Sequence, residues 1–259
     1  MCSSDLVQGN YQISRELGEQ FLSIAEGAEG DDSSRSAAHW LIGTPLLWQG
    51  HVESALSHFD QSIALYGERS SRPAIFLYGF DPVSASRGYR VIALSILGRA
   101  TQAEQESDAV VRSIADIEHP FSLAYVHMIV AMAALIRRDW ALSVKHAQIG
   151  VSISEEHGFH VYAPICQFAL GVALGRSESG DGVAAMEEGL HRYRKLSISL
   201  CLSFFSNVSR RNVLAVWTGR RRSARTRRVP SGGGENGRGI LVRRDRTPER
   251  RASKRPTPG

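Results

Sequence analysis

The chain has few residues of the kinds that build cross-links and metal centres. It contains three cysteines, Cys2, Cys166 and Cys201, and none of them belongs to a CxxC pair. A scattered, odd set of this kind supports neither a disulfide framework nor a structural zinc site. It is typical of a protein that stays in a reducing compartment, so we expect a cytoplasmic location.

Sequence signals of several functional classes are missing as well. The chain has no GxxxxGK[ST] loop for nucleotide phosphates and no GxSxG nucleophile turn. Its start has no basic segment followed by an apolar run, so we expect no secretory leader. The uncharged, apolar stretch Phe121 to Ile136 has 16 residues, which is short for a membrane span and indicates a buried helix in a soluble protein. We therefore expect no catalytic residue, cofactor, metal site or membrane contact.

Charge divides the chain into two unlike regions. From Ser206 to Gly259 there are 16 Lys and Arg residues against 3 Asp and Glu residues, whereas the rest has a net charge of −8. The Arg-, Gly- and Pro-rich end cannot bury enough apolar area to offset chain entropy. We predict that residues 205–259 are a disordered, basic, low-complexity tail. Its composition is also what GC-rich helical coding gives when read one nucleotide out of frame, so a frameshift is a second explanation.

The segment over residues 38–65 has the pattern of a helical hairpin. A helix that carries the small residue Gly43 among large apolar residues ends at Gly50, and a second helix then presents Ala55 and Phe59. Two helices pack closely only where a small side chain admits a ridge of the partner. This pattern is typical of a tetratricopeptide-type hairpin.

The hairpin pattern recurs between residues 10 and 204. Apolar periodicity predicts helices over residues 11–29, 35–49, 52–66, 84–97, 100–117, 121–136, 139–157, 160–176 and 181–195. A long loop is expected over residues 67–82, and Gly171 is expected at the close-approach position of the last hairpin. The turn markers Gly50, Gly98, Ile136 and Gly180 are 48, 38 and 44 residues apart, so the repeats diverge from an ideal unit of about 34 residues. We predict an all-α fold, a TPR-like solenoid of about four antiparallel hairpins with a curved groove.

The first predicted helix has no preceding partner, although a solenoid needs a cap on its terminal repeat. Residues 1–6 (MCSSDL) are also what a common sequencing-adapter oligonucleotide encodes. We therefore expect residues 1–9 to be a disordered, artefactual start and the natural protein to continue upstream.

Several short runs of residues are similar to a known arrangement of helical repeats. These are ELGEQFLSIAE (16–26), FLYGFDP (76–82), LSILGRATQAE (94–104), HPFSLAY (119–125), RRDWAL (137–142) and SEEHGF (154–159). With them, residues 9–202 resemble the C-terminal repeat region of bacterial multidomain signalling proteins. In that family a cyclase or DNA-binding domain precedes a STAND-type ATPase module and then tetratricopeptide-like repeats.

The resemblance implies a role in protein–protein interaction or regulation, without chemistry of its own, because it covers none of the catalytic modules. The implied partners are a protein or peptide in the concave groove and, in an intact parent, its own ATPase module. If the basic tail is genuine, its arginines, with Trp217 for stacking, are an alternative site for nucleic acid.

A few clusters invite a chemical interpretation but favour a structural one. His51 and His58, and likewise His157 and His160, lack the HExxH spacing or a nearby cysteine ligand. The pairs Glu155–Glu156 and Glu187–Glu188 lie on polar helix faces, and GGGENG (232–237) follows no predicted strand. Tyr125, Met128, Met132 and Trp140 recur at helical spacing, which is typical of core packing, although some of them could line the groove.

Overall fold

The computed structural model describes residues 2–27, 31–66, 81–115, 119–176, 182–200 and 204–205, and the regular elements within these ranges are all α-helices. They are α1 (Cys2–Gln8), α2 (Tyr11–Ala25), α3 (Asp32–Trp48), α4 (Val52–Tyr66), α6 (Pro82–Ile96), α7 (Ala100–Ala115), α8 (Pro120–Arg137), α9 (Trp140–Glu156), α10 (Tyr162–Arg176) and α11 (Gly182–Lys195). The all-α prediction is confirmed.

The helix ends are set by local chemistry, so most of them were predictable. No predicted boundary differs from the observed one by more than four residues. α3 begins three residues earlier than predicted because the Asp31 carboxylate accepts the backbone N–H of Ser34 at 2.6 Å. α6 also begins early, because Asp81 caps it and Pro82 occupies its first turn, where no N–H is needed.

Both ends of the folded body differ from the prediction. Residues 2–8, for which we expected no structure, form α1. Phe205, which we assigned to the tail, is fully buried, with its ring centroid 4.7 Å from that of Phe168 and 5.0 Å from that of Tyr193. The loop predicted over residues 67–82, apart from its last two residues, and the tail from residue 206 lie outside the described residues.

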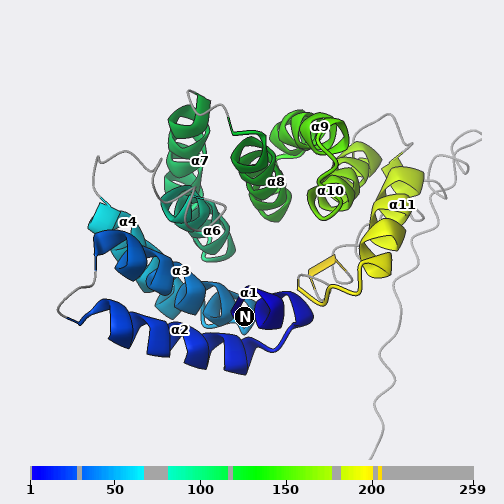
Figure 1. The fold of residues 1–259 in the computed structure, drawn as a ribbon. Coiled ribbons are helices and arrows are strands. Elements are labelled where there is room, and N and C mark those ends of the chain that lie inside the picture. The colour runs from blue at the N-terminus through cyan, green and yellow to red at the C-terminus, as the bar shows by residue number, and fades with distance from the viewer. Residues whose placement is uncertain are drawn as a thin grey trace, which may run out of the picture.

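Successive helices pack on one another in an arc that runs from α2 to α11 (Figure 1). The hairpins are α3–α4, α6–α7, α8–α9 and α10–α11, and α2 covers the outer side of α3. The first helix of each hairpin also contacts the first helix of the next, α3 with α6, α6 with α8 and α8 with α10. These four helices therefore form the inner layer of the arc.

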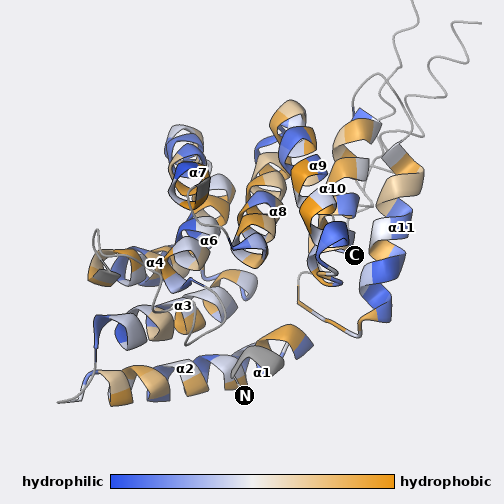
Figure 2. Cartoon of the chain, turned by 45° about the horizontal axis from the view of Figure 1, so that its top comes forward, coloured by the Kyte–Doolittle hydropathy of each residue, from blue (hydrophilic) through white to orange (hydrophobic). Residues whose placement is uncertain are grey.

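Position in the arc explains the composition of each helix. α8 lies between α6, α9 and α10, so it is apolar along most of its length, whereas α11, at the end of the arc, is largely hydrophilic (Figure 2). Within the described residues α8 is also the one helix long and apolar enough, by length and composition alone, to cross a membrane. Since 67% of it is buried inside the protein, packing against its neighbours accounts for that hydropathy.

Three of the hairpin turns contain a residue in the left-handed backbone conformation. The φ angles are +91° at Gly50, +73° at Gly98 and +63° at Arg138. In each case the residue follows the C-terminal end of the first helix, where a left-handed residue lets the chain reverse direction. Glycine adopts this conformation without strain, whereas an arginine at Arg138 does not.

In three of the hairpins, one of the polar contacts between the two helices lies at an equivalent level. In the first three, the residue on the first helix lies 11 positions before the left-handed turn residue, and its partner lies 19 positions further along the chain. The pairs are His39–His58 (3.0 Å), Arg87–Glu106 (3.9 Å), His127–His146 (2.8 Å) and, in the last hairpin, Gln167–Arg192 (2.9 Å). The first three hairpins therefore share one internal register, whereas the pair in the last hairpin is 25 positions apart.

Small residues sit where the helices approach most closely. A Cβ built on Gly43 would lie 2.7 Å from the ring of Phe59 on α4. One built on Gly171 would lie 2.2 Å from the backbone nitrogen of Met186 on α11. The predicted close-approach roles of these two glycines are confirmed.

The two ends of the arc meet across its concave side. The carbonyl oxygen of Val7, in α1, accepts the backbone N–H groups of Ser199 at 2.9 Å and Leu200 at 3.2 Å. Figure 1 shows α1 beside the segment that follows α11. The concave side is therefore bounded by the chain itself where these two ends meet.

Candidate functional site

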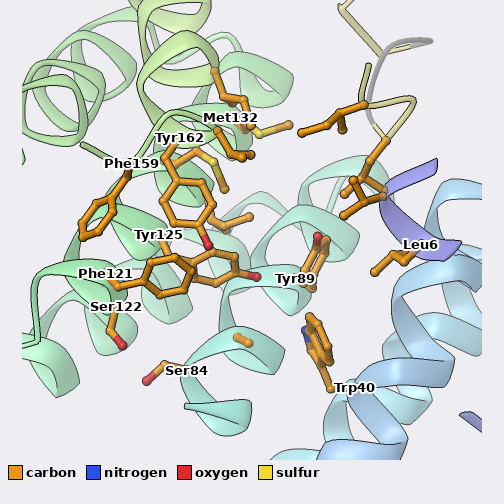
Figure 3. Close-up of a pocket in the computed structure, with 18 of the residues that line it drawn as sticks. Leu6, Trp40, Ser84, Tyr89, Phe121, Ser122, Tyr125, Met132, Phe159 and Tyr162 are labelled. Atoms are coloured by element: carbon orange, nitrogen blue, oxygen red, sulfur yellow. The ribbon is translucent and has the colours of Figure 1, made fainter. Parts of the chain in front are cut away.

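A cavity of about 400 Å³ lies on the concave side of the arc. Its walls come from the four inner helices α3, α6, α8 and α10, and Leu6, Val7, Ile198 and Leu200 close it from the side where the chain ends meet. Part of this lining, including Leu6, Trp40 and Tyr162, is drawn in Figure 3. Residues that are far apart in the sequence thus converge on one partly enclosed space.

Aromatic side chains form a continuous wall of this cavity. Trp40 and Trp48, both from α3, each have a ring centroid 6.4 Å from that of Tyr89 on α6. The ring centroid of Tyr89 lies 6.4 Å from that of Tyr125 on α8, which in turn lies 5.9 Å from that of Tyr162 on α10. Rings at such spacings attract one another, so the wall is ordered as well as apolar.

The wall continues at the N-terminal end of α8. Phe121 has a ring centroid 5.0 Å from that of Tyr162 and 5.4 Å from that of Phe159, and the three side chains lie together in Figure 3. Burial raises the pKa of Tyr162, and the nearby Cys166 raises it further, so its hydroxyl stays protonated at any physiological pH.

Several polar side chains of the lining are engaged with their own backbone or with neighbours. The Asp81 carboxylate accepts the Ser84 hydroxyl at 2.5 Å and two backbone N–H groups at the start of α6. Ser122 is hydrogen-bonded to His119 at 2.8 Å, and the Tyr193 hydroxyl donates to the carbonyl oxygen of Leu200 at 2.5 Å. These groups therefore serve to hold the helix ends in place.

The cavity carries little charge. No Lys or Arg is among the described residues that line it, and Asp81 is the one carboxylate. Since that carboxylate faces the N-terminus of α6, where the helix dipole is positive, its charge is partly compensated within the protein.

The helically spaced residues Tyr125, Met128, Met132 and Trp140 separate into two groups. The first three line the cavity. Trp140 lies elsewhere, with the guanidinium carbon of Arg176 5.4 Å from its ring centroid. Sequence reasoning missed Tyr89 and Tyr162, because they come from other hairpins and no spacing within one helix marks them as neighbours of Tyr125.

The histidines form pairs that the sequence did not reveal. His58 contacts His39, not His51, and His127 contacts His146. Burial lowers the pKa of His127 to about 4, with a further contribution from His146, so both rings are neutral at pH 7 and one donates to the other.

The remaining histidine candidates, His157 and His160, form no metal site among the described residues. His157 has a ring centroid 5.7 Å from that of Phe159, and His160 lines the cavity. Across the described ranges, no group of three or more His, Cys, Asp or Glu side chains is placed to hold a metal ion. Burial raises the pKa of the Cys166 thiol, so it is not a nucleophile.

The other sequence candidates give no site. Glu155 forms an ion pair with Arg192 at 2.7 Å, while Glu156, Glu187 and Glu188 are exposed. The GGGENG run (232–237), the tail arginines and Trp217 lie outside the described residues.

Comparison with known protein families finds no family model that matches the chain, and no curated protein matches it either. The resemblance to repeat regions of bacterial signalling proteins therefore stays a prediction.

Proposed function

We propose that this chain is a helical-repeat binding domain, a TPR-like solenoid whose concave face holds an apolar partner and so regulates a larger signalling protein in the cytoplasm. The observation that supports this most directly is the aromatic wall of the partly enclosed concave side. A cavity of about 400 Å³ is retained there, within the range of roughly 300–1,000 Å³ typical of binding sites. Side chains that served packing alone would fill such a space, because protein interiors are close-packed.

The solenoid assignment rests on the shared register of the hairpins. The levels of His39–His58, Arg87–Glu106 and His127–His146 coincide relative to their turns, and each hairpin packs on the next. Units that are equivalent and contact their neighbours in sequence are the defining property of a repeat protein.

We propose no covalent step at this site. Asp81 and Ser84 are committed to the N-terminus of α6, and the Cys166 thiol is buried and protonated. A nucleophile needs an adjacent base and access to its substrate, and the cavity wall offers neither arrangement.

Regulation would follow from binding alone. α3, α6, α8 and α10 all line the cavity, and they belong to four successive hairpins. A partner held between them stabilises one curvature of the arc, and a ligand shifts an equilibrium only by its differential affinity for the two states. In an intact parent protein such a shift would reach the ATPase module that the resemblance implies.

The test compares two probes on the full chain by isothermal titration calorimetry. One is the neutral dye N-phenyl-1-naphthylamine, and the other is an uncharged amphipathic helical peptide of leucine, glutamine and serine. Binding of either probe, weakened about tenfold by Trp40→Ala (about 1.4 kcal/mol), supports the proposal.

The matched control is Trp140→Ala, since this tryptophan is also partly buried but lies outside the cavity. It should change the affinity less than twofold. Absence of binding by both probes, or equal effects of the two substitutions, would contradict a binding role for the concave face.

A further inference from the structure

The cavity is bounded where a solenoid groove is usually open. Backbone hydrogen bonds from Ser199 and Leu200 to Val7 join the two ends of the arc, and the apolar side chains Leu6 and Ile198 line the cavity beside this junction. An amphipathic helix needs a groove that continues past both of its ends. The junction interrupts such a groove, so the geometry favours an occupant that ends within the cavity.

The chemistry of the lining restricts the charge of that occupant. An anion would leave water for a wall that presents no Lys or Arg among the described lining residues, and the desolvation of an unpaired charge is costly. A cation would find only Asp81, whose carboxylate already accepts hydrogen bonds from Val83 and Ser84. A neutral molecule meets neither cost.

The aromatic wall also restricts the shape of the molecule that the cavity can bind. Tyr89, Tyr125 and Tyr162 come from three successive inner helices, and their ring centroids are 6.4 Å and 5.9 Å apart (Figure 3). A flat aromatic ligand would bind such a wall most favourably, because it adds specific ring–ring contacts to the burial of apolar area.

From this geometry we infer that the cavity is the binding site of one small, neutral, predominantly aromatic molecule, and that such a molecule, not a polypeptide segment, is the effector of this domain. The inference deepens the proposed function and rests on it. It assigns the aromatic wall to recognition and the junction of α1 with residues 199–200 to closure of the site.

The test uses two dyes with the same ring skeleton and different charge. N-phenyl-1-naphthylamine is neutral, and 8-anilinonaphthalene-1-sulfonate adds one sulfonate. Each is titrated against the full chain while its fluorescence is followed. We expect one molecule of the neutral dye per chain, bound at least tenfold more tightly than the anionic dye.

A blocking variant locates the binding. Val161 lines the cavity and is 39% exposed, so Val161→Trp should fill its edge without disturbing the core. The matched control is Ile96→Trp, at a position 47% exposed and outside the lining. We expect Val161→Trp to weaken neutral-dye binding at least tenfold and Ile96→Trp to leave it within twofold.

The outcomes separate this inference from the proposed function. Peptide binding that depends on Trp40, without binding of the neutral dye, would overturn the small-molecule inference and leave the binding role intact. Equal affinity for the two dyes at the site that Val161→Trp blocks would overturn the restriction to neutral molecules. If neither peptide nor dye bound, both proposals would fail.

Discussion

The contact between α10 and α11 offers a sharp test of the packing, because one added methyl group meets backbone there. A Cβ on Gly171 would lie 2.2 Å from the nitrogen and 2.7 Å from the Cα of Met186, and 2.6 Å from the carbonyl oxygen of Gly182. Ordinary contacts between non-bonded carbon atoms are about 3.5–4.0 Å. Backbone atoms cannot rotate away as a side chain can, so Gly171→Ala has to push α11 outward by roughly 1 Å or more.

The expected loss of stability follows from two opposing terms. Overpacking of a close-packed contact costs about 1–3 kcal/mol, and a contact with backbone belongs at the upper end. Replacing glycine by alanine within a helix returns about 0.5–1 kcal/mol. The net destabilisation should be about 2 kcal/mol, which lowers the Tm of a domain of this size by about 4–8 °C.

The assay is urea and thermal unfolding followed by circular dichroism, with Gly88→Ala as the matched control. At Gly88 the added Cβ would meet only the side chain of Ile129, at 3.1 Å from its Cγ2 atom, and that side chain can shift. We expect Gly88→Ala to stay within about 1 kcal/mol of the parent. If Gly171→Ala were as stable as Gly88→Ala, α10 and α11 would not be as close as described, and the reasoning from backbone contact would be refuted.

Three further outcomes are expected. The folded-state pKa of His127 lies at about 4, below the unfolded value of 6.5, so the unfolded chain binds more protons between these two pH values. The free energy of unfolding, measured by urea titration, should therefore fall as the pH drops from 6.5 through 4. In His127→Gln it should fall less steeply. Arg138→Gly should raise the free energy of unfolding, measured by urea titration, by up to about 1 kcal/mol, because it removes the strain of an arginine in the left-handed backbone region; a loss of stability would show that the arginine is not strained. The buried Ser62 hydroxyl donates to the Ser36 carbonyl at 2.9 Å and contacts the Ser86 hydroxyl at 2.7 Å, so Ser62→Ala should cost about 1–3 kcal/mol in the same assay, and a neutral result would contradict that network.

The helices could be predicted because their signals are local. The capping residue Asp81, the turn glycines Gly50 and Gly98 and the apolar periodicity all act within one or two turns of the chain. Short-range signals fail mainly at the ends of the folded body. α1 and Phe205 are held by contacts with residues nearly 200 and about 40 positions away, at Ser199 and Phe168, respectively.

The candidate site was only partly predictable. The spacing of Tyr125, Met128 and Met132 showed one face of one helix, and it left open whether that face was core or groove. That face lines the same cavity as Trp40 and Tyr162 because the hairpins stack, and no spacing within one helix specifies how they stack.

The sequence by itself determined where the helices lie, which faces are apolar, and where glycines let them approach, since each of these depends on neighbours a few residues away. The tertiary structure alone decided that His39 meets His58 and His127 meets His146, and that the two ends of the arc meet on its concave side. The physical reason is that these contacts form between the two helices of a hairpin or across the arc, so they depend on the angles at which helices pack, and small side-chain differences at each contact set those angles.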